Sequence, residues 1–206
     1  MPWPTYNPRR AASVDGWRVE LRGGGSHAFD ARLTVEQDGE PESSFDASWE
    51  ARPFETPLYY GWRVSRFRGG RAWALGLVHH KRYLAEPTAE VESFSISHGY
   101  NLLTFERGWP LRRFTVWTAA GVVVAHPEST VRGRRFEESG GVGGGYYVTG
   151  PTLGLGIERR FALSKRFDLA VEGRFAASWA TVPVAGGEAS APDRSLHLLV
   201  GVGFRP

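Results

Sequence analysis

Large apolar and polar side chains alternate along most of the chain. The alternation is strict over residues 166–179, where Phe167 and Leu169 share one face and Asp168 and Glu172 share the other. A period of two residues is that of a β-strand, in which successive side chains point to opposite faces. The pattern predicts strands at residues 16–23, 58–68, 71–81, 99–108, 111–125, 146–160, 166–179 and 194–205.

The connections between these segments alternate in length. Short turns follow the second, fourth and sixth segments, whereas the other connections are long and cover residues 24–57, 82–98, 126–145 and 180–193. This asymmetry is typical of outer-membrane barrels, with long loops outside the cell and both termini in the periplasm. The sequence therefore predicts an all-β fold, an eight-stranded antiparallel up-and-down transmembrane β-barrel. We expect one domain over residues 16–206, preceded by a periplasmic tail over residues 1–15.

A soluble barrel of the lipocalin or streptavidin type would show the same period, with its apolar side chains inside. Side-chain size favours the membrane type. Bulky Leu, Val, Phe and Trp occupy one face of the strands, whereas the other face mixes Gly and Ala with charged residues. A narrow lumen suits the second set, and lipid suits the first. The lumen is then expected to hold a buried ion-pair network of Arg18, Glu20, Arg63, Glu106, Glu158, Glu172 and Arg174.

The composition agrees with a barrel. Glycine (26 residues) and aromatic residues (13%) are abundant, whereas methionine occurs once. Aromatic side chains anchor membrane proteins at the interface between lipid and water. The candidate anchors are Tyr59, Tyr60, Trp62, Trp73, Trp109, Trp117 and Trp179.

Cysteine content and charge exclude other classes. The chain has no cysteine, and therefore no disulfide, thiolate metal site or cysteine nucleophile. The net charge of +3 comes from arginines scattered between acidic residues, so nucleic-acid binding is not expected. No apolar run reaches the roughly 18 residues of a transmembrane helix. The first residues lack the apolar region of a secretory signal, which we take to have been removed.

Histidines gather near one end of the predicted barrel. His79 and Lys81 share a face of the third predicted strand, and His80 points the opposite way. An antiparallel pairing would bring His98 of the next strand close to them, and His126 ends the strand after that. Imidazoles with carboxylates from the loops could bind a divalent metal or act as acid and base. The alternative is that these histidines are amphipathic residues at the membrane rim. The cofactor is therefore unknown, and a divalent metal is expected only if the protein is an enzyme.

Several stretches of the chain resemble a known family. They read FDARLTVEQ, SFDASWEARPFETPLYYGWRV, LVHHKRYL, SHGYNLLTFERGW, VVVAHPEST and YYVTGPTLGLGIERRFALSKRFDLAVEGRF. From about residue 16 to its end, the chain resembles the small proteobacterial outer-membrane β-barrels, OmpA- and OmpW-like in fold, that include lipid A oxidase-like proteins. The resemblance implies a location in the bacterial outer membrane. It also implies that the partners of the protein are outer-membrane lipid and lipopolysaccharide.

The resemblance also implies an activity, the oxidation of the lipid A glucosamine disaccharide by molecular oxygen at the outer leaflet. In that case we expect His79, Lys81 and His98 to be catalytic, to bind a metal or to contact phosphate, and Arg82 to contact a lipid A phosphate.

Three functions follow from these observations. The main hypothesis is a monomeric integral outer-membrane barrel with a structural, binding or interaction role, in which loop 24–57 recognises a partner such as another envelope protein. The first alternative is a lipid A-modifying enzyme. The second alternative is a subunit docked to a larger envelope complex.

Overall fold

The described part of the chain is built of β-strands. The structure is a computed structural model that describes residues 15–137 and 140–206. The long strands are β1 (Gly16–Ala28), β5 (Tyr60–Arg68), β6 (Arg71–Leu84), β7 (Val91–Leu111), β8 (Phe114–Ala125), β11 (Tyr147–Ala162), β12 (Phe167–Ser178) and β15 (Asp193–Phe204). The short ones are β2 (Ala31–Gln37), β3 (Ser43–Ala47), β4 (Trp49–Glu50), β9 (Glu128–Val131), β10 (Arg134–Phe136), β13 (Thr181–Val184) and β14 (Gly187–Ser190). No helix among the described residues is long and apolar enough to cross a membrane.

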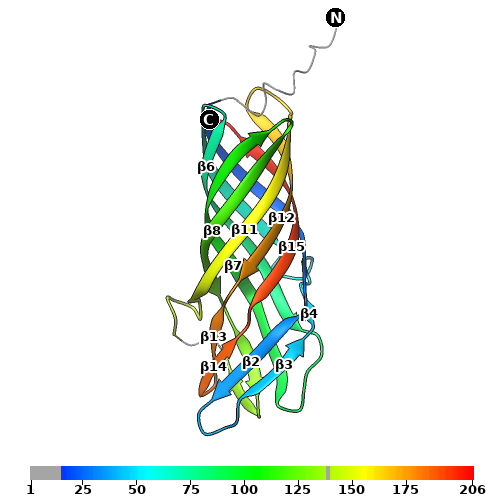
Figure 1. Cartoon of the computed structure of the whole chain (residues 1–206), viewed down its shortest axis with the longest axis vertical. Coiled ribbons are helices and arrows are strands. Elements are labelled where there is room, and N and C mark those ends of the chain that lie inside the picture. Colours follow the sequence, from blue (N-terminus) through cyan, green and yellow to red (C-terminus); the bar gives the residue numbers. More distant parts are fainter. Residues whose placement is uncertain (1–14, 138–139) are drawn as a thin grey trace, which may run out of the picture.

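The long strands close into a barrel (Figure 1). Each pairs antiparallel with the next long strand along the chain, and β15 pairs with β1 to complete the cycle. This confirms the predicted eight-stranded antiparallel barrel. The short connections lie at the end where β1 begins and β15 finishes, which we call the turn end. We call the opposite end, which carries the long connections, the loop end.

Each predicted strand coincides with one barrel strand, but β1, β6 and β7 extend at least three residues further toward the loop end than predicted, and β6 ends at Leu84. β1 continues through its glycines to Ala28, and β7 begins at Val91 rather than near residue 99. The glycine run shows no side-chain period, yet its backbone pairs with β15, where Gly24 lies opposite Leu199. A Cβ atom on Gly24 would lie 1.9 Å from the carbonyl oxygen of Leu198, so this close backbone approach requires glycine.

The long connections are themselves folded. β2 and β3 of the first connection join β13 and β14 of the last in an antiparallel sheet with the order β13-β14-β2-β3. The link is the pairing of β14 with β2, from Gly187 opposite Gln37 to Ser190 opposite Thr34. Figure 1 shows this loop-end sheet beyond the barrel mouth. Its buried side chains, Leu33, Val35, Val182, Val184 and Ala189, belong to one apolar cluster that continues into the loop end of the barrel, where it includes Phe94 and Val123.

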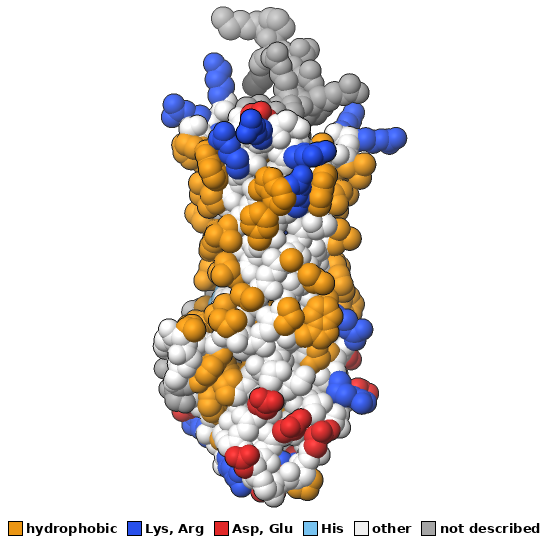
Figure 2. Space-filling model, turned by 60° about the vertical axis from the view of Figure 1, so that its left-hand side comes forward, with side chains coloured by type: hydrophobic (Ala, Val, Ile, Leu, Met, Phe, Trp, Pro, Cys, Tyr) orange, Lys and Arg blue, Asp and Glu red, His pale blue; other side chains and the backbone are white. Residues whose placement is uncertain are grey.

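The barrel is apolar outside and charged inside. On β1, Leu21 is 73% exposed, whereas its neighbour Glu20 is 1% exposed. The same contrast holds on β15 between Leu198 on the outer wall and His197 in the lumen. Exposed apolar side chains occur on all the long strands and form a hydrophobic belt, which Figure 2 shows on one face of the barrel between its two charged ends. This burial pattern is the reverse of that in a soluble barrel, and it agrees with the predicted membrane type.

Two of the predicted interfacial anchors are not on the outer wall. Trp117 is buried in the lumen against Phe67, because the absence of a side chain at Gly108 leaves room for the indole ring. Tyr59 is buried with its hydroxyl against His197 of β15. The other candidates, Tyr60, Trp62, Trp73, Trp109 and Trp179, are exposed or half-buried.

Candidate functional site

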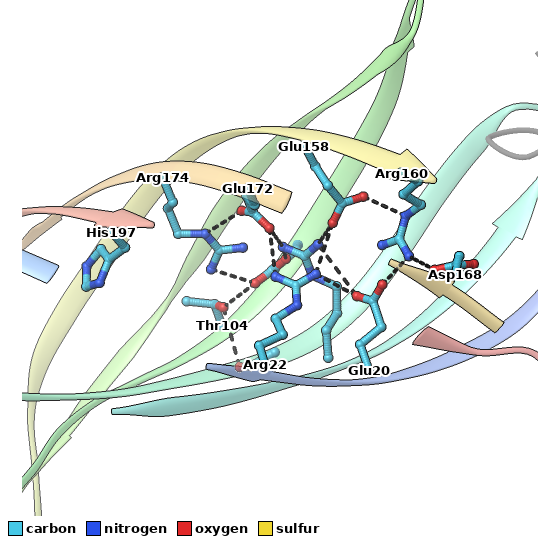
Figure 3. A network of polar contacts seen from close by, with 12 residues as sticks. Glu20, Arg22, Thr104, Glu158, Arg160, Asp168, Glu172, Arg174 and His197 are labelled. Atoms are coloured by element: carbon cyan, nitrogen blue, oxygen red, sulfur yellow. Dashed lines mark hydrogen bonds and ion pairs between the residues drawn. The ribbon is translucent and has the colours of Figure 1, made fainter. Parts of the chain in front are cut away.

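The charged residues expected in the lumen are buried and gather in one network inside the barrel (Figure 3). Arg63 of β5 lies at the centre. Its guanidinium nitrogens lie 2.7 Å from Glu106, 2.8 Å from Glu158 and 2.8 Å from Glu172. Arg174 bridges two of the same carboxylates, at 2.9 Å from Glu106 and 2.8 Å from Glu172. Strands from both sides of the barrel are therefore joined through its interior.

Three charged residues of this interior, Arg22, Arg160 and Asp168, were not included in the predicted lumen network. Arg22 lies 2.6 Å from Glu20 and 2.7 Å from Glu172. Arg160 contacts Glu20 and lies 2.8 Å from Asp168. Each lies an even number of positions from a predicted lumen residue on the same strand, so the two-residue period was the signal that could have found them.

This lumen network is balanced and buried. It contains Arg18, Arg22, Arg63, Arg160 and Arg174, with Glu20, Glu106, Glu158, Asp168 and Glu172, one guanidinium for each carboxylate. None of these side chains is more than 3% exposed. Buried charges are tolerated when they are paired and hydrogen-bonded. The arrangement is thus a plug that closes the middle of the lumen, as the narrowness of an eight-stranded barrel leads one to expect.

A second buried polar cluster lies in the lumen nearer the loop end. Asp193 of β15 accepts a hydrogen bond from Ser195 Oγ at 2.7 Å and lies 3.5 Å from His80 Nε2. Ser195 Oγ is 2.9 Å from His197 Nε2, and His197 Nδ1 is 3.0 Å from the hydroxyl of Tyr59. A nucleophilic triad places the imidazole between the serine and the carboxylate. Here the serine lies between the carboxylate and the imidazole, so the cluster does not have the arrangement of a nucleophilic triad. Every member is buried, and the cluster connects β15 to neighbouring parts of the barrel interior.

Other histidines lie on the outer wall near the loop end. His79 stacks on Tyr60, with ring centroids 4.7 Å apart, and its Nδ1 is 2.8 Å from Asn101 Oδ1. Lys81 lies on the same face of β6, and its ammonium donates to the backbone carbonyl of Glu55 at 2.8 Å. Both side chains are covered by their neighbours at this rim.

His98 lies on the same outer wall, in β7. A bulge in the β6–β7 pairing turns it outward, where its Nδ1 is 3.2 Å from Glu128 Oε1 and its ring centroid is 4.9 Å from that of His126. Among the described residues, no hydrogen bond or ion pair joins His98 to His79 or Lys81. The structure thus brings the predicted catalytic residues to one rim without uniting them. Within residues 15–137 and 140–206, no group of three or more His, Asp or Glu side chains is arranged to hold a metal ion.

Arg82, which was expected to contact a lipid A phosphate, lies inside the barrel. Its Nε is 3.2 Å from Asp193 Oδ1, and its Nη1 donates to the carbonyl of Pro192 at 2.8 Å. The guanidinium also lies 3.8 Å from the ring centroid of Trp49. Even-numbered positions of β6 point inward, so Arg82 follows His80 into the lumen and is fully buried. In this position its guanidinium does not reach a lipid headgroup.

The closed barrel, the apolar outer wall and the ion-paired lumen define the class, an eight-stranded transmembrane β-barrel of the bacterial outer-membrane type. The sequence matches no protein family model and no curated protein.

Solved structures of this class are similar over nearly the whole chain. Neisserial surface protein A is 11% identical, over 93% of this chain and 97% of its own, with a TM-score of 0.42. The attachment invasion locus protein Ail of Yersinia pestis is 10% identical, over 93% and 100%, with a TM-score of 0.43. The outer membrane protein OprG from Pseudomonas aeruginosa is 10% identical, over 95% and 98%, with a TM-score of 0.45. These values describe a likeness in fold alone.

Proposed function

We propose that the protein is an integral outer-membrane barrel that binds a partner at the cell surface through its loop-end sheet. The observation that supports this proposal most directly is that the first and last long connections pair into one sheet, whose buried side chains pack in one apolar cluster with the loop end of the barrel. The hydrophobic belt is the membrane-spanning wall. The loop end faces outward and the termini face the periplasm, which is the usual orientation of such barrels.

Contacts from other connections hold the loop-end sheet in place. Arg132, which follows β9, donates to Gln37 Oε1 of β2 at 3.2 Å and to the carbonyl of Pro41 at 2.8 Å. The same guanidinium lies 3.2 Å from Glu90. A hydrogen bond from Ser43 and the charge of Arg132 lower the pKa of Glu90, so this anchor is ionised at neutral pH. A surface ordered before binding loses less conformational entropy when a partner docks, which suits a recognition role.

The closed lumen argues against a transport role. The lumen network joins opposite walls at mid-barrel and leaves its side chains almost without solvent contact. Conduction would require breaking ion pairs between buried charges, which is costly. The lumen thus acts as a rigid support for the loop end.

Cysteine labelling tests the orientation, because the natural chain contains no cysteine. Ser44→Cys lies on β3 of the loop-end sheet, and the matched Lys165→Cys lies in the β11–β12 turn; both positions are exposed. A membrane-impermeant maleimide added to intact cells should label the first variant alone, and both after lysis. Labelling of Lys165→Cys in intact cells would contradict the orientation.

The same two positions test the recognition role. A photo-crosslinker attached at position 44 should give a discrete adduct on cells in the presence of the partner, whereas the same group at position 165 should not give that adduct. Replacing residues 31–47 with a short Gly-Ser linker should abolish the binding while the barrel still folds, as judged by heat-dependent migration on a gel. Binding unaffected by this replacement would refute the proposal. Adducts of a fixed size with other envelope proteins would instead favour a docked subunit.

The second candidate is a lipid A-modifying enzyme of the oxidase-like kind. The observation in its favour is the outer-wall group of His98, Glu128 and His126 beside His79, because it lies where the belt meets the loop end. Mass spectrometry of lipid A from cells with and without the protein tests it. An oxygen-dependent mass change that is lost in the His98→Ala variant would support the enzyme, and identical spectra would exclude this activity.

A further inference from the structure

Arginine and tryptophan alternate in a row across the outer wall near the turn end. Trp17 of β1 lies opposite Arg66 of β5, Arg66 lies opposite Trp73 of β6, and Trp73 lies opposite Arg107 of β7. Residues that face one another across neighbouring strands lie about 5 Å apart, so the four side chains form one continuous surface. We call it the Arg-Trp row.

The guanidinium groups of the Arg-Trp row lie over the indole rings. The Cζ atom of Arg107 is 3.6 Å from the ring centroid of Trp73, and that of Arg66 is 5.5 Å from the ring centroid of Trp17. Such stacking holds a cation through its flat face and leaves the N–H groups at its edge for another partner.

Within residues 15–137 and 140–206, no carboxylate forms an ion pair with Arg66 or Arg107. Residues 1–14, which precede β1, contain no Asp or Glu. The acidic residues nearest to the turn end are already occupied: Asp15 accepts a hydrogen bond from the backbone of Gly69, and Asp168 is buried in the lumen network. The two guanidiniums therefore lack an anion from the described protein.

The whole turn end is basic. Its exposed and half-buried cations are Arg66, Arg68, Arg71, Arg107, Arg112, Arg113, Arg159, Lys165, Arg166 and Arg205. Figure 2 shows Lys and Arg side chains gathered immediately beyond the hydrophobic belt at this end, whereas Asp and Glu side chains gather at the loop end. Among these cations, Arg66 and Arg107 are the ones stacked in register on the Arg-Trp row.

Apolar side chains continue from the Arg-Trp row toward the middle of the belt. Leu75 and Phe105, two positions further along β6 and β7, face each other on the outer wall and are 48% and 57% exposed. Two residues of a strand span about 7 Å, so Leu75 and Phe105 lie about 7 Å from the Arg-Trp row in the direction of the loop end. The wall thus offers a site for an anionic group at the level of the row, directly next to a surface for an acyl chain.

We propose that the Arg-Trp row binds the phosphate of an anionic phospholipid. Arg66, which lies over Trp17, and Arg107, which lies over Trp73, donate to phosphate oxygens through the edges of their guanidinium groups, and the acyl chains lie over Leu75 and Phe105. Guanidinium groups suit phosphate because their parallel N–H groups can bind two oxygens at once. A phospholipid meets both parts of the surface, whereas a soluble anion meets only the first. The inference rests on the membrane-spanning wall proposed above and not on any role of the loop-end sheet.

Quenching of tryptophan fluorescence by brominated lipids tests this proposal. The barrel is reconstituted in bilayers that contain brominated phosphatidylglycerol or brominated phosphatidylcholine, each mixed with unlabelled phosphatidylcholine, and the relative affinity of the two lipids is measured. A basic residue at an anionic surface strengthens binding by roughly fivefold, so two should give a preference of about 25-fold for phosphatidylglycerol. The Trp73→Phe variant identifies the part of the signal that arises from the row.

The variant Arg66→Gln/Arg107→Gln should reduce the preference nearly to one. The matched variant Arg68→Gln/Arg71→Gln removes the same amount of charge from the β5–β6 turn. This variant should keep most of the preference for phosphatidylglycerol. Equal affinity of the natural chain for both lipids would overturn the proposal, and so would an equal loss in both double variants, because a diffuse positive field would then suffice. Absence of quenching by either lipid would overturn the membrane-spanning wall and this inference with it.

Discussion

Replacement of Arg63 by methionine is the sharpest test of the lumen network. Arg63 contacts three carboxylates at 2.7–2.8 Å and is fully buried. Without it, the network holds one carboxylate more than it holds guanidinium groups, in a region without solvent contact. Removing one partner of a buried ion pair typically costs about 3–5 kcal/mol. We therefore expect Arg63→Met to lower the free energy of unfolding by about 4 kcal/mol.

The assay is guanidinium chloride unfolding of the barrel in lipid vesicles, followed by tryptophan fluorescence and by heat-dependent migration on a gel. With a slope of about 4 kcal/mol per M, the midpoint should fall by about 1 M. Arg63→Met/Glu106→Gln restores the charge balance and leaves Arg174 paired with Glu172. This variant should recover a large part of the loss, whereas Arg68→Met at the exposed turn should change little.

The reasoning would be refuted by either of two results. One is an unfolding midpoint for Arg63→Met that is no lower than that of Arg68→Met. The buried ion pairs of Arg63 would then contribute nothing to the free energy of unfolding. The other is a double variant that is no more stable than Arg63→Met alone, because the loss would then come from missing volume against Trp117, which Arg63 covers at 4.1 Å, and not from unpaired charge.

The remaining predictions concern the wall, the lumen space and the loop-end sheet. Leu198→Arg on the exposed belt should cost about 2–4 kcal/mol in vesicles, and an unchanged unfolding midpoint would contradict a lipid-facing wall. Gly76→Ala places a Cβ 2.5 Å from Glu106 Oε1 and should destabilise by about 1–3 kcal/mol, whereas Gly173→Ala meets nothing within 4 Å and should be neutral or stabilising in the same assay. Glu36→Cys/Glu188→Cys pairs facing positions of β2 and β14 and should form a disulfide on mild oxidation, seen as a shift on a non-reducing gel; failure to form it would argue against the loop-end sheet.

Much of the barrel was predictable because its determinants are local. The two-residue period located each barrel strand and assigned side chains such as Glu20 and Leu21 to opposite faces. The alternation of short and long connections then predicted the even strand number and the shared end of β1 and β15. The same period could have placed Arg22 and Arg160 in the lumen, since both continue the charged face of their strands.

Three features depended on contacts between distant residues. Trp117 lies in the lumen because Gly108, on the neighbouring strand, leaves space for it. A bulge against β6 turns His98 outward and separates it from His80, which an uninterrupted register would not do. The run of small residues in β1 shows no period, and only its pairing with β15 extends the strand.

The sequence by itself located the eight barrel strands, assigned their two faces and predicted an even number of antiparallel strands, because alternation and turn length are properties of neighbouring residues. Only the tertiary structure decided that segments 31–37 and 187–190, at opposite ends of the chain, pair into the loop-end sheet. Likewise, Arg66 and Arg107 are separated along the chain and meet as one row only through the register of three strands. Pairing between distant segments depends on the closed barrel that brings their ends together, and no local pattern encodes it.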